Sequence, residues 1–335
     1  MSSSVLTTVA VGVIIGLALI GTLVFIASRR GWMRNGYFTS SATILVVLGI
    51  FIAFQSLGSM LVVAIGGFTL DESNVTMLAM NGAAQLLIML VGTVVVSLAL
   101  RQNSYVVFRL EGFHRTPWIA YILSIPIMFA AQFAGEAVSS IWAKGWRLFP
   151  AIYPLLNKLE SANDKQMEAL VTAHGLGEFV LIFLFVAVIP AFAEETLFRG
   201  FAMTNIEHSG RSRTRPIYAL FLSSALFAAI HLSVFKFPGL LSLGLALGYM
   251  ASRTNNLFVG SLGHAANNGI IVIALYLAPG LDTGASASSL IGTADMPMID
   301  ALLMLGGSLP ALALLIYVFH RATEGIEPKH PLAQE

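Results

Sequence analysis

Apolar residues in this chain gather into long runs that alternate with short polar segments. A helix needs about 20 predominantly apolar residues to cross the hydrocarbon core of a bilayer. The pattern predicts membrane helices at residues 5–27, 42–66, 77–100, 117–141, 177–206, 216–232, 238–251, 257–277 and 301–319. The sequence therefore predicts an all-α polytopic membrane protein with about nine transmembrane helices.

The composition agrees with this prediction. Hydrophobic residues make up 57% of the 335 residues and charged residues 10%, and the mean hydropathy is +0.83. Soluble domains average about 45–50% apolar and about 25% charged residues. The net charge of +1 gives no reason to expect a nucleic acid as partner, so the expected surrounding is the lipid bilayer. Because the chain has no cysteine, disulfides and thiolate metal sites are excluded.

Lys and Arg in the loops predict the orientation, because cytoplasmic loops of membrane proteins are enriched in these residues. No Lys or Arg precedes the first run, so we interpret it as a retained helix rather than a cleaved signal peptide. Alternate loops then carry most of the basic residues: Arg29, Arg30, Arg34, Arg101, Arg109, Arg115, Arg211, Arg213, Arg215, Arg253, Arg321 and Lys329. This distribution predicts an integral membrane protein with its N-terminus outside and its C-terminus in the cytoplasm.

Residues 142–175 form a long connection on the predicted outer side. Its Trp142, Trp146 and Tyr153 suit the interface between membrane and water, and residues 157–173 predict a short surface helix. A cap lying on the bilayer is the favoured interpretation of this connection. A movable lid is the alternative.

Few polar residues remain inside the predicted spans, and two of them are adjacent carboxylates. Glu194 and Glu195 follow an apolar stretch, and charges at that depth normally mark a functional site. On a helix, Glu195 and Arg199 share a face, whereas Glu194 points about 100° away, so we expect Glu195 to pair with Arg199. The other polar residues considered are the pair Gln132 and Glu136, for which structural hydrogen bonding is favoured, and His231, His264, Asn267 and Asn268.

Two later spans carry polar stripes of their own. Phe227 and His231 are four residues apart, as are His264 and Asn268, so each pair lies on one helix face. A single buried histidine is usually a satisfied hydrogen-bonding residue. Three spans with polar stripes are harder to explain in that way, because each unsatisfied polar group in lipid costs several kcal/mol. We therefore expect the three stripes to converge.

These residues resemble the motifs of a known family. E-E-T-L-F-R beginning at Glu194, F-A-A-I-H ending at His231 and H-A-A-N-N beginning at His264 occur in this order. They are similar to the E-E-x-x-x-R, F-x-x-x-H and H-x-x-x-N motifs of the CAAX protease and bacteriocin-processing family, also called CPBP or Abi, which includes the type II CAAX prenyl endopeptidases. The resemblance covers roughly residues 177–276. The first three predicted helices and the last one carry no such motif.

The resemblance implies an intramembrane endopeptidase. Its substrate would be a membrane-associated peptide or protein, of a CAAX-like or bacteriocin-leader type, in a bacterial or archaeal cell membrane. In the family interpretation Glu194, helped by His231, is the general base for water. His264 and Asn268 then donate hydrogen bonds to the oxyanion. The supporting structural residues are Glu195, Arg199 and Phe227.

Metal dependence stays open at this point. Glu194, His231 and His264 are residue types found in the zinc sites of hydrolases, yet no two of them have the i, i+4 spacing of an H-E-x-x-H helix. We favour catalysis without a cofactor, with a divalent metal such as zinc as the alternative.

Two other functions compete with proteolysis. The first is an ion-coupled membrane transporter in which the two glutamates form the coupling site. Transport would predict internal repeats, and we find none in the sequence. The second is a non-catalytic membrane scaffold. The presence of all the motif residues argues against it.

The positions of the motifs divide the chain into three regions. Residues 1–116 are expected to form an N-terminal three-helix membrane region, residues 117–278 a CPBP-like protease core, and residues 279–335 a C-terminal transmembrane helix with a short cytoplasmic tail. The core is expected to form the catalytic bundle, because it carries all three motifs.

Overall fold

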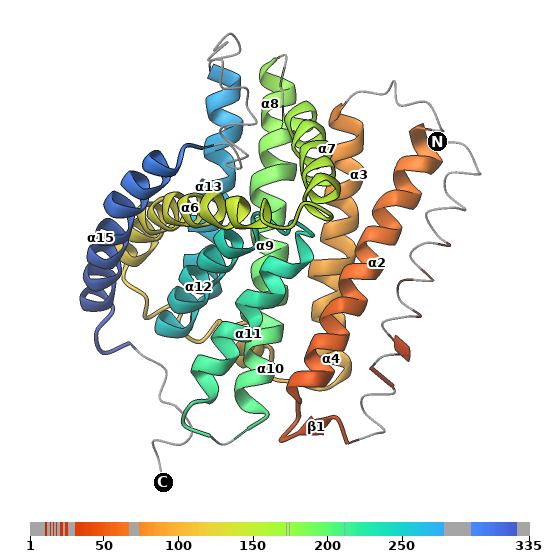
Figure 1. Cartoon of the computed structure of the whole chain (residues 1–335). Helices are drawn as coiled ribbons and strands as arrows, with labels where there is room; N and C mark the ends of the chain where they lie inside the picture. Colours follow the sequence, from red (N-terminus) through yellow and green to blue (C-terminus); the bar gives the residue numbers. More distant parts are fainter. Residues whose placement is uncertain are drawn as a thin grey trace.

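The computed structural model describes residues 31–66, 74–171, 173, 175–210, 212–277 and 296–326, with scattered positions between 11 and 25. The described structure is 81% helical and contains one two-stranded hairpin. The predicted all-α fold is therefore confirmed. Figure 1 shows the helices gathered into one bundle.

The elements follow one another in this order. The first half of the chain contains β1 (Met33–Arg34), β2 (Tyr37–Phe38), α2 (Ser40–Gly66), α3 (Asn74–Ala84), η1 (Gln85–Gly92), α4 (Thr93–Ala99), α5 (Ser104–Val107), α6 (Trp118–Trp146) and α7 (Tyr153–Val171). The second half contains α8 (Leu176–Ile182), η2 (Phe183–Val188), α9 (Ile189–Glu195), η3 (Thr196–Ala202), α10 (Met203–His208), α11 (Arg215–Ile230), α12 (Phe237–Thr254), α13 (Leu257–Leu277) and α15 (Met298–Ala322). The η elements are π-helical stretches, which often mark functional sites inside longer helices.

Six helices in the described part are long and apolar enough to cross a membrane. They are Ser40–Gly58, Met77–Ala99, Trp118–Trp146, Leu176–His208, Leu257–Leu277 and Met298–Ala322. They correspond to six of the predicted spans, with ends within five residues except at Gly58, where the prediction was 66 and α2 itself continues to Gly66. The predicted first span lies largely outside the described residues.

The prediction of nine spans is not confirmed, because neither α11 nor α12 is among the helices that are long and apolar enough to cross a membrane. α11 has 16 residues, fewer than the roughly 17–25 residues of a spanning helix. α12 has 18 residues, which is long enough, but it does not qualify as an apolar span.

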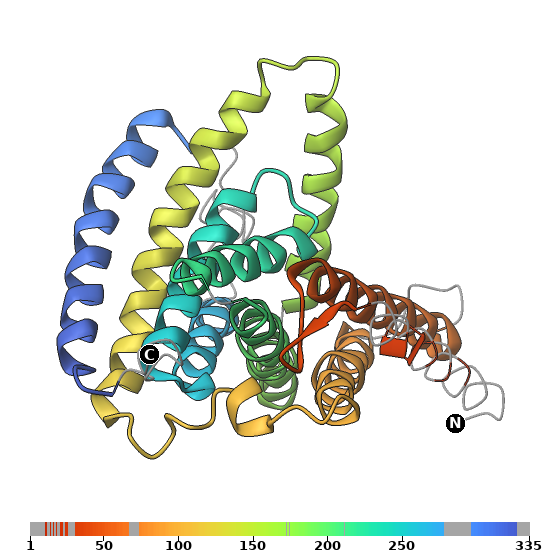
Figure 2. The same cartoon turned by 90° about the horizontal axis from the view of Figure 1, so that it is seen from below.

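The helix Leu176–His208 runs through the middle of the bundle. It consists of α8, η2, α9, η3 and α10, and α9 packs against η1 on one side and α13 on the other (Figure 1). Figure 2 shows α15 beside α6 at one edge of the molecule. α6 in turn packs against α12 and α13. The three motifs therefore lie on helices at the centre of the bundle, between α6 and the N-terminal helices.

α11 ends at the second motif. Its last residue is Ile230, and His231 follows as the C-terminal cap. Leu232 then adopts a left-handed backbone with φ of +54°, which turns the chain before α12 begins at Phe237. His231 is thus presented at a helix end rather than in the middle of a span.

The predicted surface helix at residues 157–173 is present as α7. Its Glu160 Oε1 accepts a hydrogen bond from Ser233 Oγ at 2.6 Å, and its Asp164 forms an ion pair with Lys236. Both partners belong to the turn between α11 and α12. These two contacts hold α7 against the chain segment that follows His231.

The hairpin of β1 and β2 was not expected from the apolar pattern. Met33 pairs with Phe38, and the turn between the strands is Asn35-Gly36, with φ of +53° and +82°. Positive φ at both turn residues suits Asn-Gly, which is the strongest short hairpin signal in a sequence. Phe38 N donates to Asn205 Oδ1 at 2.9 Å, so the hairpin is tied to the end of the central helix.

Candidate active site

The central helix carries the two adjacent glutamates at the junction of α9 and η3. Glu194 and Glu195 are buried, with exposed fractions of 9% and 0%. Arg199 Nη1 donates to Glu195 Oε1 at 2.8 Å, and neither side chain of this pair reaches solvent. The pair expected from the i, i+4 spacing is therefore present, and Glu194 lies outside it.

Arg199 also contacts two neighbouring helices. Its guanidinium carbon lies 4.3 Å from the centre of the Phe227 ring on α11, a cation–π distance. Its Nη2 donates to the backbone oxygen of Gly244 on α12 at 3.3 Å. The two helices fit this closely because Gly244 has no side chain: a Cβ there would lie 2.9 Å from Ser224 Cβ. The guanidinium thus joins three helices.

His264 lies between the two glutamates. Its Nδ1 is 3.2 Å from Glu195 Oε1 and its Nε2 is 3.9 Å from Glu194 Oε2. An ionised carboxylate only accepts hydrogen bonds, so Nδ1 carries a hydrogen and donates it to Glu195. The ring is 5% exposed and packs edge-on against Phe227, with ring centres 5.8 Å apart. The first and third motifs are therefore in direct contact.

Glu194 has a hydrogen-bond donor from the N-terminal helices. Gln85 Nε2 donates to Glu194 Oε1 at 3.1 Å. Gln85 is the first residue of η1 and is 5% exposed. The two oxygens of Glu194 therefore face different groups, Gln85 and His264.

A cavity of about 470 Å³ adjoins Glu194. One residue from each of the three motifs lines it, namely Glu194, His231 and Asn268. The rest of its wall is formed by Phe51, Phe54, Gln55, Leu78, Asn81, Gln85, Met89, Val171, Phe185, Val186, Pro190, Ile230 and Ile271. The wall is thus mainly apolar, and helices before the three motifs provide about half of it.

The hydrogen bonds of His231 and Asn268 fix which polar atoms they can offer to the cavity. His231 Nδ1 is 2.8 Å from the backbone oxygen of Phe227, which can only accept, so Nδ1 carries a hydrogen and neutral His231 has an acceptor at Nε2. Asn268 Nδ2 makes a long contact of 3.4 Å with the backbone oxygen of Val186. The site therefore combines a carboxylate, an imidazole acceptor and an amide donor.

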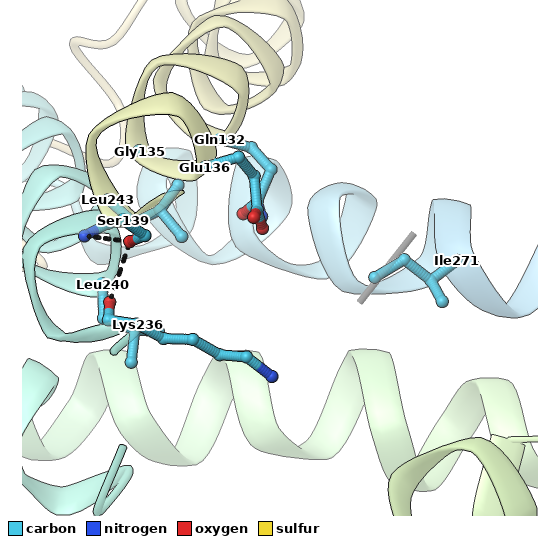
Figure 3. A pocket seen from close by; sticks show the side chains of 9 residues that line it. Gln132, Gly135, Glu136, Ser139, Lys236, Leu240, Leu243 and Ile271 are labelled. Atoms are coloured by element: carbon cyan, nitrogen blue, oxygen red, sulfur yellow. Dashed lines mark hydrogen bonds between the residues drawn. The ribbon is translucent and has the colours of Figure 1, made fainter. Parts of the chain in front are cut away.

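A second, smaller cavity of about 160 Å³ lies between α6 and α12. Figure 3 shows Gln132 and Glu136 on its wall with their polar ends together, and Gln132 Nε2 donates to Glu136 Oε1. Asn267 Nδ2 donates to Gln132 Oε1 at 3.3 Å, and Ile271 lines both cavities. The neighbours Asn267 and Asn268 therefore have different hydrogen-bond partners, and the partner of Asn267 is Gln132 on α6.

The metal alternative receives no support from the described residues. Glu194, His231 and His264 were the candidate ligands, but no group of three or more His, Asp or Glu side chains in the described ranges is arranged to hold a metal ion. His264 also uses Nδ1 for Glu195.

Sequence reasoning missed three amide side chains in the cavity wall. Gln55 lies on α2, Asn81 on α3 and Gln85 on η1, and all three line the cavity. The signal was available, because these residues interrupt apolar runs, and Asn81 and Gln85 have the i, i+4 spacing of one helix face. What the sequence could not supply is the packing that brings Gln85 to Glu194.

These features define a polytopic membrane protein whose bundle holds a carboxylate, histidine and amide cluster beside an apolar cavity. Residues 176–270 match the family model described as type II CAAX prenyl endopeptidase Rce1-like. The match confirms the resemblance to the CAAX protease and bacteriocin-processing family that the three motifs indicated. A match to this family implies a protease. No curated protein and no solved structure matches the chain.

Proposed function

We propose that the chain is an intramembrane endopeptidase that hydrolyses a peptide bond in a membrane-associated substrate. The observation that carries the proposal is the cavity of about 470 Å³, where residues from all three motifs meet. Its mainly apolar wall suits an apolar peptide segment. The apolar helices around it support a reaction within the membrane.

The first step requires activation of water. Glu194 takes one proton from a water molecule in the cavity. His231 Nε2 accepts a hydrogen bond from the same water and so orients it. The water oxygen then bonds to the substrate carbonyl carbon. The proton held by Glu194 passes to the leaving nitrogen as the C–N bond breaks, which gives a carboxylic acid and an amine. General acid–base catalysis of this kind contributes roughly 10²- to 10⁴-fold.

The oxyanion that forms in between needs hydrogen-bond donors. Asn268 Nδ2 exchanges its long contact with Val186 for the oxyanion. His264 donates through Nε2, which requires a second proton on the ring, because Nδ1 already donates to Glu195. Glu194 Oε2, 3.9 Å away, can share the proton taken from water with that nitrogen. No step is assigned to a metal.

We expect Asn268→Ala to lower kcat by roughly 10²- to 10³-fold, the usual loss for one oxyanion donor. The protein should still fold, because Asn268 makes only a long contact with Val186. Asn267→Ala is the matched control, because it removes the same amide group one residue earlier. Asn267 donates to Gln132, so its loss should lower kcat much less than the loss of Asn268. Peptide cleavage in detergent checks both variants. Equal losses would contradict the assignment of the oxyanion donor.

The substrate can be found by comparing membrane proteomes. Cells producing the parent protein and cells producing Glu194→Gln should differ in new N-termini that appear only with the parent. A synthetic peptide spanning that site should then be cleaved by the purified protein. Identical sets of termini, together with no cleavage by the purified parent of any such peptide, would refute the proposed function.

We also propose the orientation given by the basic loops. Ser212 and Ala151 are exposed and lie in segments that we assign to opposite sides. Because the chain has no cysteine, a single introduced cysteine reports its own side. Ser212→Cys should react with an impermeant thiol reagent only after the membrane is opened, and Ala151→Cys should react in intact cells. The reverse result would invert the orientation.

A further inference from the structure

Neither the motifs nor the family match explains why Gln85 contacts Glu194. Gln85 lies outside residues 176–270, the segment that the family model matches, yet it donates a hydrogen bond to Glu194 at 3.1 Å. It is buried, and its side chain lines the same cavity as Glu194. A polar side chain inside an apolar span is costly unless it is hydrogen-bonded, so the contact with Glu194 explains how Gln85 is accommodated there.

The contact determines how the Glu194 carboxylate is turned. The last torsion of a glutamate side chain has a broad, roughly two-fold preference, so the carboxylate plane is not fixed by the helix alone. Gln85 holds Oε1, and Oε2 is then directed to the side of His264 Nε2. One oxygen is anchored and the other is available for proton transfer.

The chemical type of the donor also differs between the two glutamates. Glu195 is paired with a cation, Arg199, and a charge-assisted hydrogen bond of that kind is about twice as strong as a neutral one. Glu194 receives its bond from a neutral amide, which orients the carboxylate without neutralising its charge.

We infer that Gln85 is a positioning residue that fixes the Glu194 carboxylate for its work as the base. This inference rests on the proposed endopeptidase function. It gives the N-terminal helices a part in the reaction: η1 supplies the residue that orients the base, and Gln85 and Met89 of η1 also form part of the cavity wall.

The test is Gln85→Met, which keeps the length and shape of the side chain and removes the donor. kcat should fall roughly 10- to 100-fold, because misplacing a reacting group by about 1 Å can cost about 10²-fold, and KM should change much less. Thr93→Val is the matched control: Thr93 is a buried polar residue in the same membrane span, bonded to the backbone oxygen of Met89 and absent from the cavity wall. It should keep the parent kcat.

A double variant separates positioning from general damage. In a Glu194→Gln background the residual cleavage should not fall further when Gln85→Met is added, because Gln85 acts through Glu194. A full kcat in Gln85→Met, an equal loss in Thr93→Val, or a further loss in the double variant would each overturn the inference.

The same variants distinguish a failure of this inference from a failure of the proposed function. If the parent protein cleaves nothing, the proposed function falls, and the Gln85–Glu194 contact is then judged by thermal unfolding in detergent. For this measurement Glu194→Met replaces Glu194→Gln, because a glutamine could still accept the bond from Gln85. The shift in Tm of Glu194→Met combined with Gln85→Met should be smaller than the sum of the single shifts, as expected for residues in contact. Additive shifts would show that the contact itself is wrong.

Discussion

Glu194→Gln should be a folded protein that retains only a small residual cleavage activity. Glutamine has the shape of glutamate, and its side-chain oxygen can still accept the hydrogen bond from Gln85, which is 3.1 Å from Glu194 Oε1. Because the Arg199 pair involves Glu195 and not Glu194, the substitution leaves no buried cation unpaired. An amide cannot take a proton from water, so the loss in kcat should be at least the roughly 10²- to 10⁴-fold contribution of a general base.

The measurement combines peptide cleavage with thermal unfolding in detergent. Glu136→Gln is the matched control, because Glu136 is a carboxylate of the same bundle that lies at the second cavity with Gln132. It should keep cleavage, and Glu194→Gln should keep the parent Tm or exceed it. Substantial cleavage by Glu194→Gln would remove the mechanism proposed here. Loss of folding would show that Glu194 has a structural role instead.

The apolar pattern predicted most of the helices, because the thickness of the membrane requires a similar length of apolar sequence in every span. The boundaries of α6 and α13 agree with the predicted 117–141 and 257–277 within a few residues. The spans that are not confirmed include α11, which was expected at 216–232 and is a helix of 16 residues that ends at Ile230. Its end depends on a left-handed residue, Leu232, and leucine carries no sequence signal for that conformation.

The candidate site was predictable only where the geometry is local. The pair of Glu195 with Arg199 follows from the i, i+4 spacing of one helix. The position of His264 between both glutamates depends on how α13 packs against α9, which no spacing within a single helix determines. The contact with Gln85 depends in the same way on the packing of η1, which no local pattern encodes.

The second large effect is expected at the buried pair. Glu195→Gln leaves the Arg199 guanidinium, which is fully buried, without its counter-ion. Breaking a buried pair on one side typically costs about 3–5 kcal/mol. Glutamine can keep an oxygen at the Oε1 position, which accepts from both Arg199 Nη1 and His264 Nδ1, so the expected loss comes from the missing charge and not from a missing acceptor. We expect a strongly lowered Tm, and low cleavage that follows from poor folding.

The converse change, Arg199→Gln, should be as destabilising for a related reason. It leaves Glu195 charged and buried, with His264 as its remaining hydrogen-bond partner among the described residues, and it removes the contact with the Phe227 ring. Glu324→Gln is the control for the loss of a carboxylate from an ion pair: Glu324 pairs with Arg321 on the exposed end of α15, where such pairs contribute about 0–1 kcal/mol. Its Tm should match that of the parent.

Exchanging the two residues, as Glu195→Arg with Arg199→Glu, should not restore stability. On an isolated helix the exchange would keep an opposite pair four residues apart and cost little. Here each position has its own partners. A guanidinium at position 195 would face His264 Nδ1, which already lies 3.2 Å from Glu195 Oε1, and a carboxylate at position 199 would face the backbone oxygen of Gly244.

The exchanged protein therefore brings donor against donor and acceptor against acceptor. The backbone of Gly260 lies close to Glu195: a Cβ built on this glycine would be 3.2 Å from Glu195 Oε2. A longer side chain at position 195 therefore has little room on that side. We expect a Tm near that of the single variants. A Tm near that of the parent would mean that Glu195 and Arg199 act only as a helix pair, and that the contacts with His264 and Gly244 contribute little to the fold.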